Sequence, residues 1–135
     1  MSNQICGNMK STFILIVSII LIYSCNNKRD IVVNQKIKIE FQHFEGCPNG
    51  PKLLKNLKDA MIGYEDKIDF SEQIIDSPEL AKKFNFRGSP TLLIDGKDMD
   101  GMETPENPSL ACRFYPNGLP TADSIRLKIQ KIIQN

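Results

Sequence analysis

The segment FEGCPNGPKLLKNL, residues 44–57, joins two stretches of different periodicity and has Cys47 at the junction. Before it, KIKIEFQHF (residues 36–44) alternates apolar and polar side chains, which predicts a strand. After it, the leucines and the following Ala60 and Met61 recur at the spacing of an amphipathic helix, with lysines on the outer face. Cys47 therefore stands at the start of a helix that directly follows a strand.

The rest of the chain completes an α/β pattern. Ser77 and Pro78 suit the N-cap and first position of a helix, and Asp95-Gly96 is a hairpin signal. The elements predicted after residue 63 are a strand at 67–75, a helix at 77–85, strands at 91–94 and 97–99, an irregular stretch at 100–120 and a helix at 121–134. A strand, crossover helix and strand make a parallel pair, and the hairpin adds antiparallel strands. The sequence thus predicts the order β-α-β-α-β-β-α around a mixed four-stranded sheet.

A short apolar run lies near the N-terminus. FILIVSIILI, residues 13–22, spans about 15 Å as a helix, roughly half of a hydrocarbon core, so we expect a signal segment. The following LIYSC resembles a bacterial lipoprotein signal, in which cleavage before Cys25 leaves that cysteine lipidated. This reading divides the chain into a signal segment at 1–25, a polar tether at 26–35 and a folded domain at 36–135.

This reading predicts a protein of the bacterial cell envelope, held to the membrane by an N-terminal lipid and facing the periplasm or the exterior. An uncleaved N-terminal anchor is the alternative, and it also leaves the domain outside the cytoplasm. The charged residues are balanced, 17 Lys and Arg against 16 Asp and Glu, which gives no electrostatic case for nucleic acid.

Metal and cofactor chemistry finds little support in the composition. One histidine and no Cys-x-x-Cys motif make too few ligands for a structural zinc site, so we expect neither a resident metal nor a cofactor. Two thiolates can still hold a soft ion such as mercury or copper(I).

The position of Cys47 at a helix start favours the thiolate form of its side chain. The free N–H groups and the dipole of a helix N-terminus stabilise a thiolate, which is the nucleophilic form of cysteine. Pro48 suits this place because its missing N–H would have no partner in the first turn. The alternative is that Cys47 is a small buried apolar residue.

The chain resembles the thioredoxin superfamily over residues 36–135. Cys47 begins the first helix after the first strand, the order of elements agrees, and Ser89-Pro90 precedes the third strand, where the superfamily has a cis-proline facing its cysteine. FEGCPNGPKLLKNL, RGSPTLLIDGKD and ACRFYPNGLPT also look like a group of small bacterial proteins labelled thioredoxin family or, by similarity, alkylmercury lyase. The resemblance implies a three-layer thioredoxin-like fold in which Ser89, Pro90 and the flanking backbone bind a substrate chain.

The sequence departs from this family at Gly50, where the common Cys-x-x-Cys pattern has its second cysteine. Cys6 is removed with the leader and Cys25 carries the lipid, so the domain keeps Cys47 and Cys112, an even number in an oxidising compartment. The hairpin after the third strand returns the chain to the edge of the sheet where Cys47 lies. A Cys47–Cys112 disulfide, catalytic or structural, is therefore reasonable, and an isolated loop thiol at Cys112 is the alternative.

Three charged or titratable residues are further candidates. Glu45 can transfer protons beside Cys47, or be a solvated loop carboxylate. His43 can tune the thiol, or be a half-buried strand residue. Arg113 can stabilise a thiolate or bind an anion, or be a surface charge. Asp98, with Asp100 nearby, is expected at a turn or strand edge and not as a ligand.

Three functions remain open on these grounds. The first is a thiol-disulfide oxidoreductase with Cys47 as nucleophile, Cys112 and Glu45 as candidate partners, and protein or small-molecule thiols and disulfides as substrates. The second is alkylmercury lysis or soft-metal binding, in which both cysteines trap the metal and Glu45 protonates the leaving group. The third is a non-catalytic binding module that keeps the fold and a structural Cys47–Cys112 bridge.

Overall fold

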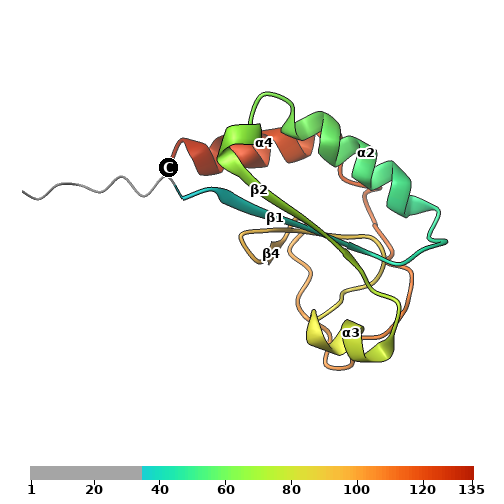
Figure 1. The fold of residues 1–135 in the computed structure, drawn as a ribbon. Coiled ribbons are helices and arrows are strands. Elements are labelled where there is room, and N and C mark those ends of the chain that lie inside the picture. The colour runs from blue at the N-terminus through green and yellow to red at the C-terminus, as the bar shows by residue number, and fades with distance from the viewer. Residues whose placement is uncertain (1–34) are drawn as a thin grey trace, which may run out of the picture. The chain divides into compact units, whose positions relative to one another are not determined.

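The computed structural model describes residues 35–135, an α/β unit with a mixed four-stranded open sheet and three helices (Figure 1). The elements are β1 (Ile37–His43), α2 (Asn49–Met61), the 3-10 turn η1 (Glu65–Lys67), β2 (Ile68–Ile74), α3 (Pro78–Lys83), β3 (Thr91–Ile94), β4 (Lys97–Asp98) and α4 (Ala122–Ile133). The predicted signal segment with Cys25, and the predicted tether except Gln35, lie outside the described residues. Within residues 35–135, no helix has the length and apolar content needed to cross a membrane.

The sheet has the strand order β2-β1-β3-β4. β1 pairs with β2 in parallel and with β3 antiparallel, and β4 pairs antiparallel with β3. The predicted order of elements and the mixed four-stranded sheet are therefore confirmed. α2 lies between β1 and β2 in the chain and returns it to the end of the sheet where β1 begins. β2 therefore runs parallel to β1.

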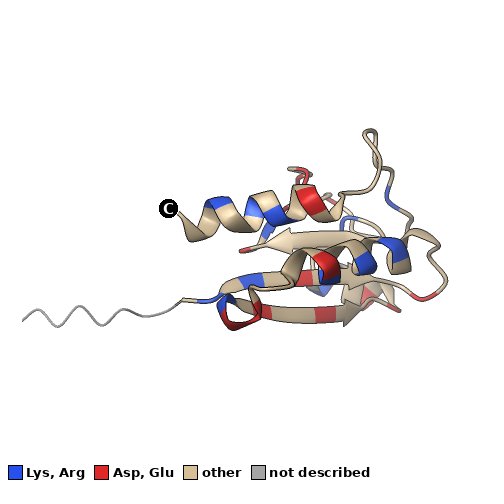
Figure 2. Cartoon of the chain, turned by 90° about the horizontal axis from the view of Figure 1, so that it is seen from above, with Lys and Arg blue, Asp and Glu red and all other residues tan. Residues whose placement is uncertain are grey.

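The main core lies between one face of the sheet and the two long helices, α2 and α4 (Figure 1). Phe41 of β1 is fully buried against Leu57 of α2 and Ile125 of α4, among other members of the cluster. Full burial of one such side chain stabilises the fold by about 1.5–3 kcal/mol. The predicted apolar stripes of both helices are thus confirmed, and Figure 2 shows basic and acidic residues interspersed along their remaining surface.

α3 lies on the opposite side of the sheet from α2 and α4, near the end of β2 (Figure 1). A second small core of Ile75, Ala81 and Phe86 forms there. This side of the sheet also buries Gln42, whose side-chain amide donates to Glu40 Oε1 at 2.6 Å and to the Phe84 carbonyl at 3.2 Å. The polar face of β1 is therefore covered at its C-terminal end.

Local signals in the sequence fix several element ends. The N-cap Ser77 accepts a hydrogen bond from Leu80 N at 3.3 Å, as predicted. Asp95 and Gly96 both have positive φ angles in the β3–β4 turn, where Asp95 Oδ1 also accepts from Lys38 N. β4 ends at Asp98, one residue earlier than expected, because the Asp98 carboxylate accepts the N–H groups of Asp100 and Met102 and turns the chain away.

Candidate functional site

Cys47 sits in a tight turn between β1 and α2. Its N–H donates to the Phe44 carbonyl at 3.5 Å, and Gly46, with φ +88°, makes the turn without the strain that a side chain would add. Gly50 N donates to the Cys47 carbonyl at 3.1 Å, which starts the helix. The side chain of Cys47 points inward, and the residue is only 4% exposed.

Ser89 is the residue that organises the surroundings of Cys47. Its carbonyl oxygen lies 3.4 Å from Cys47 Sγ and accepts the thiol proton, while its hydroxyl accepts from Phe44 N at 3.2 Å. The Ser89–Pro90 peptide bond is cis, as the resemblance to the thioredoxin superfamily implied. The turn that carries Cys47 is thus fastened to the start of β3.

Cys112 lies beside the same serine. Ser89 N donates to the Ala111 carbonyl at 2.8 Å and the Ser89 carbonyl accepts from Arg113 N at 2.9 Å, so Ser89 and Cys112 form an isolated parallel bridge. Cys112 is exposed, and both cysteines carry free thiols in the structure. Ser89 therefore contacts both segments, through the Cys47 thiol on one and the backbone on either side of Cys112 on the other.

Gly88 allows this close approach. Its φ is +97°, and a Cβ at this position would lie 3.1–3.2 Å from Arg113 Cβ, Arg113 Cα and the Ala111 carbonyl. A larger residue would push the Cys112 segment away from Ser89. In the sequence, the signal for this role is the glycine directly before the Ser-Pro pair.

The two thiols have different acidities. Burial raises the pKa of Cys47, but hydrogen bonds from the Ser89 side chain, the backbone N–H groups of Asn49 and Gly50 and the Cys112 thiol outweigh burial and lower it overall. For Cys112, desolvation and the neighbouring Cys47 sulfur raise the pKa. Cys47 is thus the thiol that ionises first, as its place at a helix N-terminus predicts.

Glu45 and His43 lie on either side of the turn. Glu45 is exposed and lines a hollow of about 470 Å³ together with His43, Cys47 and the start of α2. His43 Nε2 lies 2.8 Å from Glu72 Oε1 on β2, and its ring lies 4.9 Å from that of Phe41. The structure therefore brings Glu45 to the hollow at Cys47 and engages His43 with a carboxylate on the neighbouring strand.

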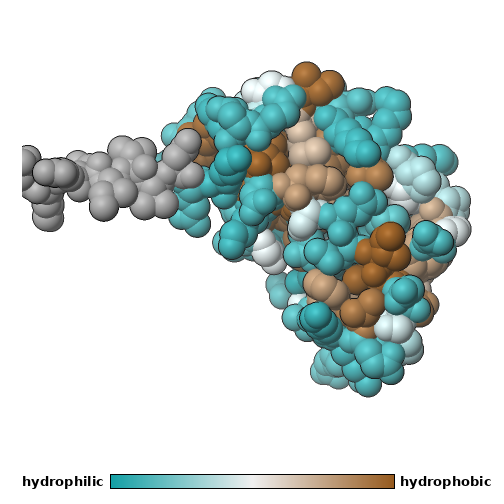
Figure 3. Space-filling model, in the orientation of Figure 1, coloured by the Kyte–Doolittle hydropathy of each residue, from teal (hydrophilic) through white to brown (hydrophobic). Residues whose placement is uncertain are grey.

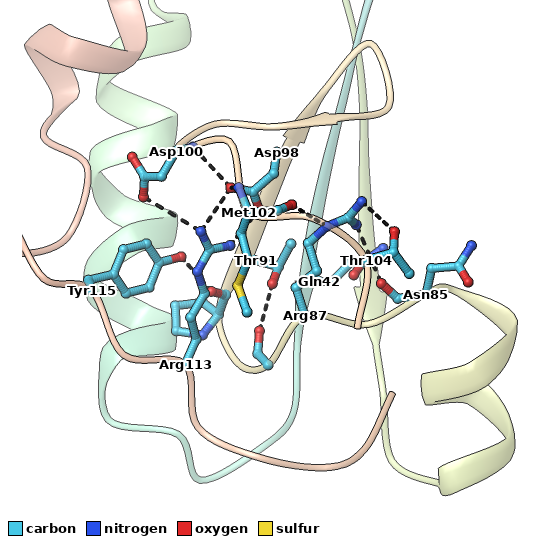
Figure 4. A network of polar contacts seen from close by, with 12 residues as sticks. Gln42, Asn85, Arg87, Thr91, Asp98, Asp100, Met102, Thr104, Arg113 and Tyr115 are labelled. Carbon is cyan, nitrogen blue, oxygen red and sulfur yellow. Dashed lines mark hydrogen bonds and ion pairs between the residues drawn. The ribbon is translucent and has the colours of Figure 1, made fainter. Parts of the chain in front are cut away.

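Arg113 is buried, and its charge is matched by Asp98 (Figure 4). Its guanidinium donates to both Asp98 oxygens, at 2.5 and 2.8 Å, and lies 3.7 Å from an Asp100 oxygen. It also stacks over Tyr115, at 4.5 Å from the ring centre, and the Tyr115 hydroxyl donates to the Pro90 carbonyl at 2.6 Å. Arg113 is therefore neither a surface charge nor a group that faces a thiolate: it fastens the Cys112 segment to β4.

Burial and the ion pair with Arg113 together set the pKa of Asp98. Desolvation raises the pKa of Asp98, but hydrogen bonds from Arg113 and Met102 N outweigh it and lower the pKa overall. Asp98 and Tyr115 were not singled out as functional from the sequence. Their contacts join residues 15 to 25 positions apart in an irregular stretch, where no periodic pattern marks a partner.

Two further shallow hollows lie near the segments that carry the cysteines. One of about 570 Å³ is lined by Phe44, Glu45, Ile74 and Leu110, among others, and another of about 430 Å³ includes Cys112, Met102 and Phe114. Figure 3 shows apolar surface near the end of β2, above α3. Among residues 35–135, no group of three or more His, Cys, Asp or Glu side chains is placed to hold a metal ion.

Comparison with known proteins adds no family to this picture. Neither a family model nor a curated protein matches the chain. The functional conclusion therefore depends on the geometry around Cys47, Ser89 and Cys112.

Proposed function

We propose that this protein is a thioredoxin-like thiol-disulfide oxidoreductase that uses Cys47 as its nucleophile and Cys112 as the partner thiol. The observation that carries the proposal is the position of Ser89, which hydrogen-bonds Cys47 through its carbonyl and bridges to Cys112 through its backbone. Two thiols from distant parts of the sequence are thereby held on one side of the sheet. Their different acidities give one thiolate and one thiol at the same pH.

The chemistry needs only these two sulfurs and an external disulfide. The Cys47 thiolate attacks a disulfide RS–SR, forms a Cys47–SR bond and releases RS⁻. Cys112, after losing its proton, then attacks Cys47 Sγ, forms the Cys47–Cys112 disulfide and releases the second RS⁻. Two electrons pass from the cysteine pair to the substrate. Glu45, on the hollow at Cys47, is the candidate group for moving the thiol proton.

The proposal also covers the fold of the domain and the location of the protein in the cell. The order of elements, the helix that begins after Cys47 and the Ser89–Pro90 pair before β3 support a thioredoxin-like topology. In that topology Ser89 and Pro90 bind the substrate backbone. An N-terminal lipid on Cys25 would hold the domain in the cell envelope, where thiols meet disulfides of other proteins.

A redox titration tests the proposal. The full chain carrying Cys6→Ser and Cys25→Ser keeps only the two domain cysteines, and it is equilibrated with glutathione buffers of increasing oxidised fraction. We expect one intramolecular disulfide, which acid trapping and mass spectrometry identify as Cys47–Cys112. Further replacement of Cys112 by Ser should leave only a glutathione adduct on Cys47. Failure of the two cysteines to pair at any buffer ratio would reject the proposal.

Soft-metal chemistry is the second candidate, because the same observation places two free thiols side by side. Two thiolates bind mercury or copper(I) in two-coordinate geometry, and Glu45 would supply the proton for alkylmercury lysis. Titration of the same protein with methylmercury distinguishes the two functions. Release of methane that requires both cysteines would favour the lyase, and reversible disulfide exchange without it favours the oxidoreductase. A bridge that forms once and is inert to glutathione would indicate a binding module.

A further inference from the structure

The two sulfurs of the pair differ in their access to a partner. Cys47 is 4% exposed and its thiol donates to the Ser89 carbonyl, whereas Cys112 is exposed. Attack on a disulfide proceeds in line with the sulfur–sulfur bond, so the attacked sulfur must be open on the side away from the leaving sulfur. Cys112 is the more exposed of the two residues and is therefore the sulfur that an external thiolate reaches more easily.

We propose that the disulfide form of this protein is a disulfide donor whose entry point is Cys112. A partner thiolate RS⁻ attacks Cys112 Sγ, the Cys47–Cys112 bond breaks, and Cys47 leaves as the thiolate. The second thiolate of the partner then attacks the partner sulfur of the mixed disulfide and expels Cys112. The partner dithiol loses two electrons, and the cysteine pair gains them. This inference rests on the proposed function and adds which sulfur meets the substrate.

The surroundings of Cys47 favour its departure. The N–H groups of Asn49 and Gly50 at the start of α2 and the side chain of Ser89 stabilise the Cys47 thiolate. Thiols of lower pKa are the better leaving groups in disulfide exchange. Cys112, whose pKa is raised, takes up a proton on release and does not readily re-attack. A small-molecule disulfide such as glutathione disulfide restores the oxidised pair.

The segment around Cys112 also indicates the partner's chemistry. Leu110 and Phe114, two residues on either side of Cys112, are 42% and 83% exposed, while Arg113 between them is buried. Two exposed apolar side chains therefore lie within two residues of the thiol along the chain. Hollows of about 570 and 430 Å³ open beside Leu110 and Phe114. The partner that fits this surface is an extended polypeptide with apolar residues next to its cysteine.

Trapping of the first mixed disulfide tests the entry point. The full chain with Cys6→Ser and Cys25→Ser is oxidised to the Cys47–Cys112 form and mixed with a peptide that contains one cysteine between leucines. Acid quenching, alkylation of free thiols and mass spectrometry then locate the peptide. We expect about tenfold more adduct on Cys112 than on Cys47, because access and leaving-group acidity act in the same direction. Adduct mainly on Cys47, or equally on both, would overturn the inference and leave the proposed function standing.

A second arm tests the apolar contact. The same reaction is timed with a matched peptide that has serines in place of the leucines, and with the variant Phe114→Ser, whose side chain makes little contact with the fold. We expect the leucine peptide to react about tenfold faster, and Phe114→Ser to remove most of that advantage. Equal rates for the two peptides would reject the polypeptide partner. If no Cys47–Cys112 disulfide forms at the outset, the proposed function itself fails.

Discussion

Cys47 experiences two opposing influences, burial among apolar side chains and hydrogen bonding at the start of a helix. Burial alone would keep the thiol protonated and inert, as for an ordinary core cysteine. The hydrogen bonds from Ser89 and from Asn49 and Gly50 decide the outcome in favour of the thiolate. Cys47 is thus buried like a core residue and has the lowered pKa of a nucleophile. A substitution at position 50 directly tests whether Cys47 can form a disulfide.

Replacement of Gly50 by cysteine should create a working adjacent pair. A Cβ at position 50 would lie 3.7 Å from His43 Nδ1 and 4.0 Å from His43 Cβ, which is ordinary contact. Gly50 N donates to the Cys47 carbonyl at 3.1 Å across the turn that starts α2, so a thiol introduced at position 50 would be close to Cys47. In the background without Cys6, Cys25 and Cys112, we expect the Gly50→Cys protein to form an intramolecular disulfide between the introduced thiol and Cys47 in glutathione buffer.

Gly50→Ser in the same background is the matched control, since it adds a side chain of similar size without a second thiol. It should give only a glutathione adduct on Cys47. A Gly50→Cys protein that also gives only adducts would show that the turn holds Cys47 away from position 50. Mass spectrometry of acid-trapped samples distinguishes the two results.

At the scale of elements, residues 100–120 have no regular structure and yet are fastened at several points. Arg87 donates to the Met102 carbonyl at 2.9 Å and to Thr104 Oγ1 at 2.8 Å, and Asn56 donates to the Pro120 carbonyl at 2.9 Å. The Asp98–Arg113 pair lies between these anchors and is almost completely buried, with side chains 1% and 4% exposed. Polar contacts, more than apolar packing, therefore position Cys112.

Removal of Asp98 should show how much the Asp98–Arg113 pair contributes to the free energy of unfolding. Asp98→Ala leaves the buried Arg113 charge without its main partner, which costs about 3–5 kcal/mol of the free energy of unfolding. It also removes the acceptor for Asp100 N and Met102 N. Urea unfolding of the reduced protein measures the loss.

Asp100→Ala is the control for this prediction. Asp100 is 44% exposed and lies 3.7 Å from the same guanidinium, so its removal should cost less than about 1 kcal/mol. Equal losses for the two variants would contradict the view that the buried pair anchors the segment. Retention of full stability by Asp98→Ala would have the same meaning.

At the scale of the whole molecule, the acidity of Cys47 links redox chemistry to stability. The pKa of Cys47 is lowered in the folded protein and ordinary in the unfolded chain. Between these two values the unfolded state holds a proton that the folded state has released, so the free energy of unfolding rises with pH. This contribution is complete above the ordinary thiol pKa and is lost as pH falls through the lowered one.

The expected observation is a stability difference between the reduced protein and Cys47→Ser that grows in favour of the native cysteine as pH rises through that window. Both proteins carry Cys112→Ser, because the pKa of Cys112 depends on the Cys47 sulfur. Serine does not titrate there, so the difference isolates the Cys47 thiol. For Cys112, whose pKa is raised, the free energy of unfolding decreases as pH rises, and this change occurs at more alkaline pH. Urea unfolding of both proteins over a pH series is the measurement. A difference that does not change with pH would contradict a stabilised Cys47 thiolate.

Much of the fold and half of the site could be predicted from local patterns. The alternation in β1, the apolar stripes of α2 and α4 and the N-cap at Ser77 are short-range features, because each depends on residues a few positions apart. The place of Cys47 at a helix start and the Ser89–Pro90 pair before β3 belong to the same class. These features could be recognised in the chain before any contact was known.

What the amino-acid sequence by itself determined, then, is the order of the elements and the place of Cys47 at a helix start, since both follow from periodicity and from helix ends. Only the tertiary structure decided that Cys112 bridges to Ser89, that Arg113 is buried against Asp98, and that Gln42 is covered by α3. Each of these contacts joins residues from 15 to 42 positions apart through an irregular stretch or across the sheet. Hydrogen-bond partners at such separations are set by where the packed core brings the backbone, and no local periodicity records them.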